Sequence, residues 1–199
     1  MFFIQGIILM LFFFISSYLV KDKINTLNGK NVVYVSYGLV SIAGVVWITM
    51  YEKDSCKTMM ELLLLQGLFL ISLIDFFFKV VPNRLLLLLL VVCVVIFGFQ
   101  IQCNLSVLPA FLLDLIFCIG FLSGCCLLLR KGIGMGDLKL LFVIEIYTSF
   151  TGMLQILLFG AFFAAISSVF LWVCRKKFEK KEFAFVPFLC LGYIMYLLL

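Results

Sequence analysis

The chain has 199 residues, of which 66% are hydrophobic and 13% are charged; its formal net charge is +5 and its mean hydropathy is +1.30. Soluble globular domains are roughly 45–50% apolar, so this composition excludes a soluble protein and indicates a polytopic membrane protein. The chain contains no histidine, which excludes Ser-His and Cys-His catalysis. The net charge does not indicate a nucleic-acid partner, because the basic residues lie in loops beside the membrane.

Apolar runs follow one another along the whole chain. A helix crosses a bilayer with about 20 residues, so eight crossings leave no room for a separate soluble domain. The first run has no basic region and no small-residue cleavage site after it, so we expect a membrane helix rather than a cleaved signal peptide. The sixth run is short, and we expect a tight turn at Ser149–Gly152 after it. The runs are 2–20, 32–50, 59–74, 84–101, 107–129, 138–150, 152–174 and 183–199.

These runs predict an all-α polytopic membrane protein of about eight transmembrane helices, forming a single membrane-embedded domain over residues 1–199. Every second loop, counted from the first run, is basic. Only Lys53 and Lys57 of the 15 Lys and Arg residues lie in the other loops. By the positive-inside rule the basic loops face the cytoplasm, so both termini lie outside. The basic loops are 21–31, 75–84, 130–139 and 175–182.

The eight cysteines form no Cys-x-x-Cys pair, and most of them lie inside apolar runs. We interpret them as small hydrophobic residues rather than as metal ligands or redox groups. We therefore expect no bound metal and no cofactor. The cysteines are Cys56, Cys93, Cys103, Cys118, Cys125, Cys126, Cys174 and Cys190.

A glycine-rich turn separates the fifth and sixth runs. Gly132, Gly134 and Gly136 alternate and lead to Asp137, and Lys139 follows two residues later. Glycine suits sharp bends and the close approach of another segment. An ionisable group at the mouth of a membrane helix indicates a function; the alternative is a short cytoplasmic turn with a solvated Asp–Lys pair.

A second aspartate, Asp75, ends the third run on the same cytoplasmic side. Three phenylalanines follow it, so it does not lie in an ordinary solvated loop. Pro82 and Asn83 come seven and eight residues later. Proline cannot donate to a helix ladder but suits a helix start, so we expect the fourth helix to begin there.

Two carboxylates on one face of a membrane bundle are able to hydrolyse an amide. Placed near each other, they share a proton. The ionised partner takes a proton from water, while the protonated partner polarises the carbonyl and later serves the leaving amine. The pair titrates as a unit, so neither role is assigned to Asp75 or Asp137 alone. Lys139 either assists at this site, by biasing the titration of the pair or by holding the developing oxyanion, or is a snorkelling interfacial lysine.

Three other acids lie inside apolar runs. Asp114 and Glu61 are near outer helix ends, where they reach the interface. Glu145 lies eight residues after Asp137, which places it about 80° around a helix and roughly 12 Å along its axis. A charge at the bilayer centre costs roughly 2.5–3.5 kcal/mol, so Glu145 is a candidate for a functional role.

The motifs together resemble a known family. Residues 132–139 resemble the GxGD signature of type IV prepilin peptidases, the membrane aspartic proteases that mature pilin-like precursors. Asp75, followed by Pro82 and Asn83, resembles their first aspartate motif, D-x6-P-[ND]. Residues 185–189, FVPFL, resemble their PFGPFLALG segment. The three matches fall in the family's order with similar spacing and cover about residues 30–199.

The resemblance implies an aspartic endopeptidase at the cytoplasmic face of the cell membrane, with Asp75 and Asp137 as its catalytic residues. The implied substrates are prepilins or pseudopilins, whose short basic leader is cleaved after a glycine, ahead of a hydrophobic helix. Anionic lipid would hold the basic leader, because the loops near the site are themselves basic. The supporting motif residues are Gly134, Gly136, Lys139, Pro82 and Asn83.

Two departures from the family's pattern have consequences. Full-length bacterial members carry a cytoplasmic insert with two zinc-binding Cys-x-x-Cys pairs, whereas residues 21–31 here contain no cysteine. We therefore expect neither a structural zinc site nor the N-methylation that those members perform with S-adenosylmethionine. The chain resembles the short members of the family, which also lack the insert. Glu145 falls where the family usually has a small residue.

Other readings remain open at the level of sequence. Presenilin-like proteases also use GxGD but pair it with Tyr-Asp and Pro-Ala-Leu elements, which differ from Ile74-Asp75 and Val186-Pro187-Phe188 here. A small proton-coupled transporter would use the buried acids as a relay and predicts internal repeats, of which we see none. A catalytically inactive scaffold is the third reading, although both aspartates are present.

Overall fold

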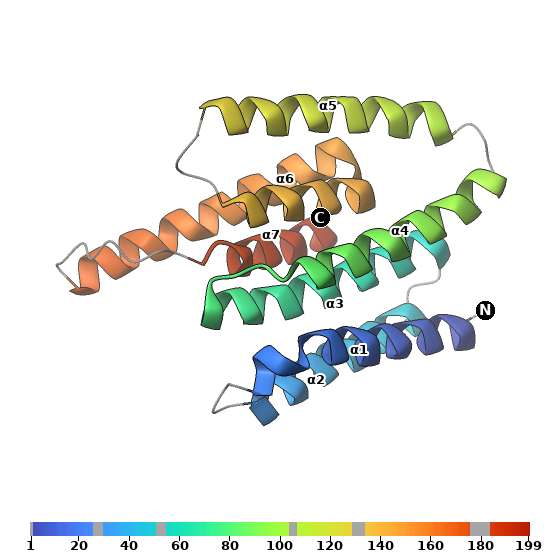
Figure 1. Cartoon of the computed structure of the whole chain (residues 1–199), viewed down its shortest axis with the longest axis horizontal. Helices are drawn as coiled ribbons and strands as arrows, with labels where there is room; N and C mark the ends of the chain where they lie inside the picture. Colours follow the sequence, from blue (N-terminus) through green and yellow to red (C-terminus); the bar gives the residue numbers. More distant parts are fainter. Residues whose placement is uncertain (1, 26–29, 51–54, 104–106, 129–133, 176–183) are drawn as a thin grey trace.

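The structure, a computed structural model, describes residues 2–25, 30–50, 55–103, 107–128, 134–175 and 184–199. These residues are helical apart from short links (Figure 1). The helices are α1 (Phe2–Asn25), α2 (Lys30–Met50), α3 (Ser55–Phe78), α4 (Asn83–Cys103), α5 (Val107–Leu128), α6 (Met135–Arg175) and α7 (Val186–Leu198).

Three segments are long and apolar enough to cross a membrane: Thr58–Phe78, Leu108–Leu127 and Met135–Phe170. Helices α1, α2, α4 and α7 are also apolar, over the stretches 7–21, 33–43, 83–98 and 186–198 of the described residues. The predicted all-α fold is therefore confirmed for the described residues, and the three segments indicate a membrane protein. The described part of the chain nevertheless has seven helices where the sequence predicts eight runs, because the runs at 138–150 and 152–174 are joined in α6.

Helix α6 is interrupted near its middle. Ser149 has φ 78° and ψ 166°, outside the helical region, and the chain doubles back there (Figure 1). Thr148 donates from its hydroxyl to the carbonyl of Ile144 at 2.9 Å just before this point. The tight turn expected at Ser149–Gly152 is thus a kink at its first residue, with helix on both sides.

Helix α3 lies at the centre of the bundle and contacts α1, α2, α4, α6 and α7. Its membrane-length segment is 56% buried, against 6% for that of α5. Both segments are strongly apolar, so the greater burial of α3 comes from its place among five other helices. Its completely buried residues include Leu63, Leu64, Leu68, Leu70 and Ile71.

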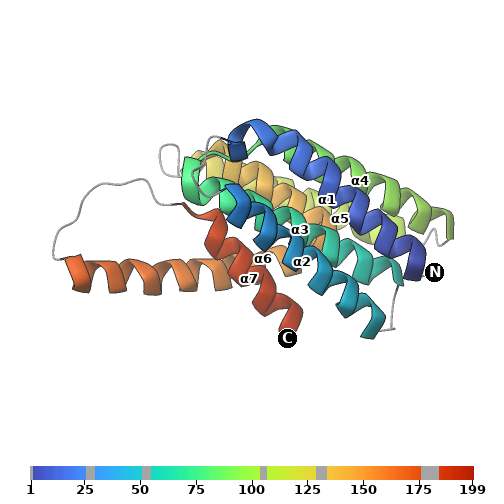
Figure 2. The ribbon, with the colours of Figure 1, turned by 90° about the horizontal axis from the view of Figure 1, so that it is seen from below.

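Helix α7 crosses the second half of α6 at very short range (Figure 2). A Cβ atom built on Gly192 would lie 2.5 Å from the carbonyl oxygen of Ile156 and 2.8 Å from the backbone nitrogen of Gly160. Only glycine permits this approach, because both neighbours are backbone atoms. The contact fixes α7 beside α6 and so determines where Val186, at the start of α7, lies.

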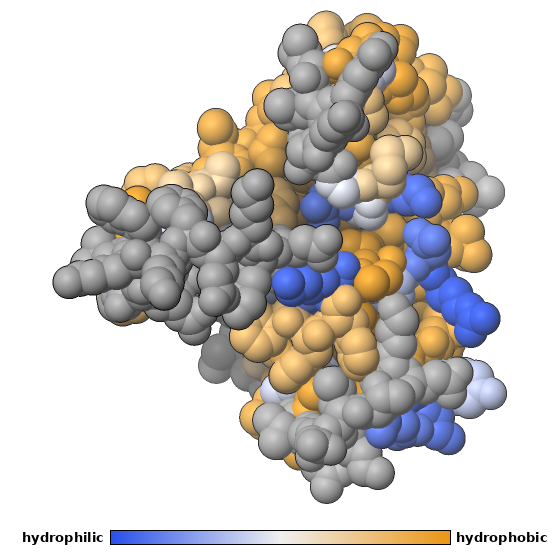
Figure 3. All heavy atoms as spheres, turned by 60° about the vertical axis from the view of Figure 1, so that its left-hand side comes forward, coloured by the Kyte–Doolittle hydropathy of each residue, from blue (hydrophilic) through white to orange (hydrophobic). Residues whose placement is uncertain are grey.

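One end of the bundle collects the ends of several helices. Helices α1, α3 and α5 finish there, and α2, α4, α6 and α7 begin there, with both termini of the chain toward the opposite end (Figure 1). We call this the basic end, after its exposed residues Lys21, Lys79, Arg84 and Lys139. Figure 3, which brings it forward, shows hydrophilic side chains set among apolar ones.

Candidate active site

Asp75 lies in the last turn of α3, three residues before the helix ends at Phe78. The predicted third run stops at residue 74, but the three phenylalanines continue the helix to Phe78. Lys79 then takes a left-handed conformation with φ 53°, and its N–H donates to the carbonyl of Asp75 at 2.8 Å. This bond is the usual αL termination of a helix, and the conformation costs a residue other than glycine roughly 1–2 kcal/mol. The chain therefore turns sharply directly after Asp75.

The Asp75 side chain is almost completely buried, with 6% of its surface exposed. Its Oδ2 atom accepts a hydrogen bond from the backbone N–H of Val186 at 3.2 Å. Val186 is the first residue of α7, and Pro187 follows it in the first turn. Helix N-termini carry partial positive charge and free N–H groups. The α7 N-terminus therefore stabilises the carboxylate and fixes its orientation.

Asp137 lies in the first turn of α6. Its backbone N–H donates to the carbonyl of Gly134 at 3.0 Å, and the N–H of Leu138 donates to the same oxygen at 3.3 Å. The predicted sixth run begins at 138, whereas the helix begins at Met135. The second aspartate is therefore part of a helix N-terminus, where a negative charge is favourable.

The two described glycines of this turn permit close approach rather than a left-handed backbone, since no described glycine has a positive φ. A Cβ atom on Gly136 would lie 3.0 Å from Cβ of Val81, in the link between α3 and α4. A Cβ atom on Gly134 would lie 3.2 Å from Oδ2 of Asp137. Gly136 thus lets α6 start against the α3–α4 link, and Gly134 leaves space for the carboxylate. Gly132 lies outside the described residues.

The structure brings the two aspartates together at the basic end. Their carboxylates are close enough to repel one another electrostatically, and the Lys79 ammonium is close enough to attract Asp75. Asp137 is more exposed than Asp75, so water reaches the pair from the side of α6. Lys79 was not among the residues singled out in the sequence, because nothing there indicates that α3 ends in a left-handed lysine.

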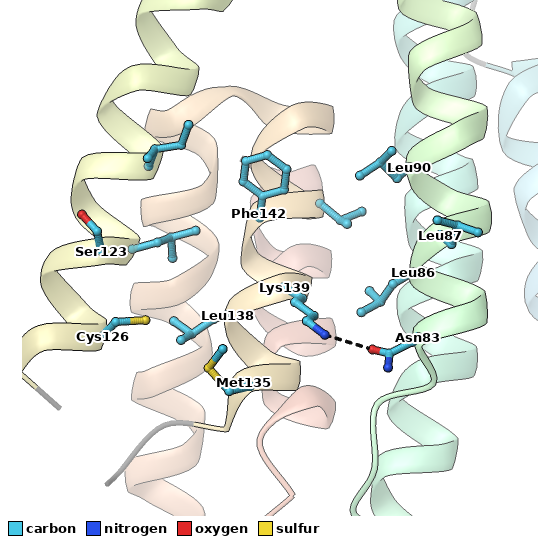
Figure 4. A pocket seen from close by; sticks show the side chains of 13 residues that line it. Asn83, Leu86, Leu87, Leu90, Ser123, Cys126, Met135, Leu138, Lys139 and Phe142 are labelled. Carbon is cyan, nitrogen blue, oxygen red and sulfur yellow. Dashed lines mark hydrogen bonds between the residues drawn. The ribbon is translucent and has the colours of Figure 1, made fainter. Parts of the chain in front are cut away.

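The supporting motif residues join the same region. Pro82 directly precedes α4, as predicted, and its carbonyl accepts from the N–H groups of Leu85 and Leu86 at 3.1 and 3.2 Å. The Lys139 ammonium lies 3.5 Å from Oδ1 of Asn83 (Figure 4). This exposed contact connects α4 to α6, so the two aspartate motifs meet through their flanking residues as well.

An apolar groove begins beside this contact. It has a volume of about 560 Å³ and lies between α4, α5 and the first half of α6 (Figure 4). Lys139 and Asn83 line its end nearest the aspartates, and neither Asp75 nor Asp137 lines it. The other lining residues are Leu86, Leu87, Leu90, Ile119, Leu122, Ser123, Cys126, Met135, Leu138, Phe142 and Val143.

Glu145 lies away from the aspartates, deeper in the first half of α6. Its side chain is 1% exposed, and among the described residues neither carboxylate oxygen has a hydrogen-bond partner. It is within electrostatic range of Asp114 in α5. Glu61 is only partly buried, and its backbone carbonyl accepts from the Tyr193 hydroxyl at 2.8 Å. The structure does not bring these acids into the site.

Residues 62–169 match the type IV leader peptidase family. The chain belongs to this family. The matched range contains both Asp75 and Asp137 and ends before Val186, so the contact of α7 with Asp75 comes from the structure and not from the match. No curated protein and no solved structure matches the chain. The resemblance to prepilin peptidases is therefore confirmed at the level of the leader peptidase family.

Proposed function

We propose that this leader peptidase is an aspartic endopeptidase that removes the basic leader from type IV prepilin-like or pseudopilin precursors. The observation that carries the proposal is the meeting of Asp75, from the end of α3, with Asp137, from the start of α6. Both carboxylates lie at the basic end of an all-helical membrane protein, within electrostatic range of each other. Membership of the family supports a peptide bond as the substrate.

In the proposed mechanism the two carboxylates share one proton. The ionised partner removes a proton from a water molecule, which attacks the scissile carbonyl, and the protonated partner donates to the carbonyl oxygen. When the tetrahedral intermediate collapses, the first partner passes its proton to the leaving amine, and the second partner takes a proton back from the hydroxyl as the carbonyl re-forms. The Val186 N–H occupies Oδ2 of Asp75, so the other oxygen of Asp75 is the one that faces the water and the substrate.

The lysines have different roles in this mechanism. Lys79 is close enough to attract the Asp75 carboxylate and so offsets part of its repulsion with Asp137. Lys139 is directed to Asn83, so we assign it the task of holding α4 against α6 rather than that of binding the oxyanion. Gly134 leaves space beside the Asp137 carboxylate, and Gly136 lets α6 begin close to Val81.

We further propose that the whole chain is a single domain that crosses the cell membrane eight times, with the basic end in the cytoplasm. The kink at Ser149 divides α6 into two halves, which supports counting them as separate crossings. The exposed Lys and Arg residues of the basic end support the cytoplasmic orientation. Basic leaders would then meet the enzyme on the side where anionic lipid holds them.

The test is cleavage of a precursor by the purified protein in vesicles that contain anionic lipid. We expect one cut, directly after the leader glycine, seen as a smaller band and as a defined new N-terminus by mass spectrometry. The same spectrum shows whether the new N-terminus carries a methyl group, which we expect to be absent. An intact precursor, or cleavage at scattered positions, would contradict the proposal.

A further inference from the structure

The groove beside the aspartates is open along its length. Leu87 of α4 and Ile119 of α5, on its two walls, are 66% and 51% exposed. Helix α5 packs loosely, since only 6% of its membrane-length segment is buried, and its contacts with α4 are few. An apolar molecule within the bilayer therefore reaches the groove from the side, without passing through the bundle.

The length and apolar lining of the groove fit one side of a helix. On α6 it runs from Met135 to Val143, which is about 12 Å or roughly two helical turns. A peptide in this apolar setting must satisfy its own backbone hydrogen bonds, so it has to be helical. Ser123 and Cys126 give the α5 wall two small side chains, which is typical of surfaces where membrane helices approach closely.

The groove ends beside the candidate active site, on the face of α6 opposite to Asp137. Lys139 and Asn83 form its end nearest the aspartates, and Met135 and Lys139 are the lining residues two positions to either side of Asp137. A helix that lies in the groove and ends there would leave its adjoining peptide within reach of Asp75 and Asp137.

We infer that this groove binds the apolar helix of the protein substrate, which enters sideways between α4 and α5 and presents the peptide that adjoins it to Asp75 and Asp137. The inference rests on the proposed function and adds the place where the substrate is held. It also assigns a role to α5, which packs loosely and contributes little to the core of the bundle.

The first experiment compares two substrates. One is a precursor with a basic leader ending in glycine, followed by a helix of about 20 apolar residues; the other is a short peptide that spans only the cleavage position. Ser123→Trp fills the groove from an exposed position. The matched control is Leu113→Trp on the same helix, because Leu113 is 58% exposed and does not line the groove.

We expect Ser123→Trp to lower kcat/KM for the helix-bearing precursor about tenfold, mainly through KM, since it removes binding rather than chemistry. Cleavage of the short peptide should be unchanged, and Leu113→Trp should change neither reaction. Equal effects of Ser123→Trp on both substrates, or none on either, would overturn the inference. A wild-type protein that cleaves neither substrate would instead contradict the proposed function itself.

A second measurement does not depend on activity. A photoreactive benzophenone amino acid is placed at position 123 or at position 113 in the Asp137→Asn protein, in vesicles with the helix-bearing precursor. We expect a cross-link from position 123 to the precursor's apolar helix and none from position 113. Cross-linking of position 123 to lipid alone would show that acyl chains fill the groove and would overturn the inference.

Discussion

The Oδ2 atom of Asp75 lies 3.2 Å from the backbone nitrogen of Val186, which donates a hydrogen bond to it from 111 residues further along the chain. This contact joins the end of α3 to the start of α7. Asp137 approaches from the start of α6, so two helix N-termini point toward the same pair of carboxylates. Their partial positive charges compensate part of the repulsion between the aspartates.

The hydrogen bond from Val186 can be removed without removing an aspartate. Val186→Pro deletes the N–H at a helix position that accepts proline, whereas Val186→Ala keeps it. Hydrogen bonds to charged groups contribute about 1.5–3 kcal/mol, so we expect Val186→Pro to reduce the cleavage rate about 10- to 100-fold relative to Val186→Ala. Rates are compared at equal folded fraction by thermal unfolding, because proline also disfavours the α conformation of Phe185. Equal rates for the two variants would show that the bond does not matter.

Alanine substitutions at Gly134 and at Gly136 should have different effects on cleavage and on stability. In Gly134→Ala the new methyl group lies 3.2 Å from Oδ2 of Asp137, at an exposed position. We expect cleavage to fall up to about tenfold, because small displacements of catalytic groups are costly, with little change in unfolding temperature. In Gly136→Ala the methyl group meets Val81 at 3.0 Å, and overpacking costs about 1–3 kcal/mol, so stability should fall as well.

The matched control is Gly98→Ala in α4, where a Cβ atom has no neighbour within 4 Å. Alanine is a better helix former than glycine by about 1 kcal/mol, so this variant should be neutral or slightly more stable and should cleave normally. If Gly134→Ala behaved like Gly98→Ala in the cleavage assay, the space beside the Asp137 carboxylate would not be needed.

Gly192→Ala should be the most destabilising of the glycine changes. Its methyl group would lie 2.5 Å from the carbonyl oxygen of Ile156 and 2.8 Å from the nitrogen of Gly160, and backbone atoms cannot rotate away. We expect α7 to separate from α6, with a loss of about 3 kcal/mol or more in unfolding free energy. Thermal unfolding in detergent measures this loss, and an unfolding temperature equal to that of Gly98→Ala would contradict the close contact.

Glu145 is predicted to be a source of instability. An unpartnered polar group in a buried position costs about 1–3 kcal/mol, so Glu145→Met, which is similar in length, should raise the unfolding temperature. If cleavage also remains normal, the acid has no role in the reaction. A gain in stability with a loss of cleavage would indicate that the acid is retained for function. A lower unfolding temperature would mean that Glu145 has a partner and would contradict the environment described here.

The sequence predicts much of the site but not its assembly. Hydrophobic runs are sufficient to locate the helices, and the spacing of Asp75, Pro82 and Asn83 locates the start of α4. The end of α3 is missed by four residues, because the phenylalanines continue the helix and a left-handed Lys79 stops it. The break within α6 is predicted at residues 149–152, and the structure has it at the first of them, Ser149.

Contacts between residues that are far apart in the sequence cannot be predicted from local sequence patterns. The FVPFL segment is visible in the sequence, but the bond from Val186 to Asp75 depends on how closely α7 packs on α6 through Gly192 and Gly160. The groove depends in the same way on the loose packing of α5, although its segment of 20 residues is as apolar as the 21-residue segment of the buried α3. Periodicity does not distinguish a helix that faces lipid from one that faces the core.

The central claim is that Asp75 and Asp137 act together on a peptide bond. The most direct measurement is the cleavage rate of a leader-bearing precursor by wild type, Asp75→Asn and Asp137→Asn in vesicles, with Asp114→Asn as the matched control. We predict that each of the first two substitutions lowers the rate by about 10²–10⁴-fold or more with the unfolding temperature retained, and that Asp114→Asn leaves it unchanged. Cleavage at the wild-type rate by either Asp75→Asn or Asp137→Asn would contradict the paired-carboxylate mechanism.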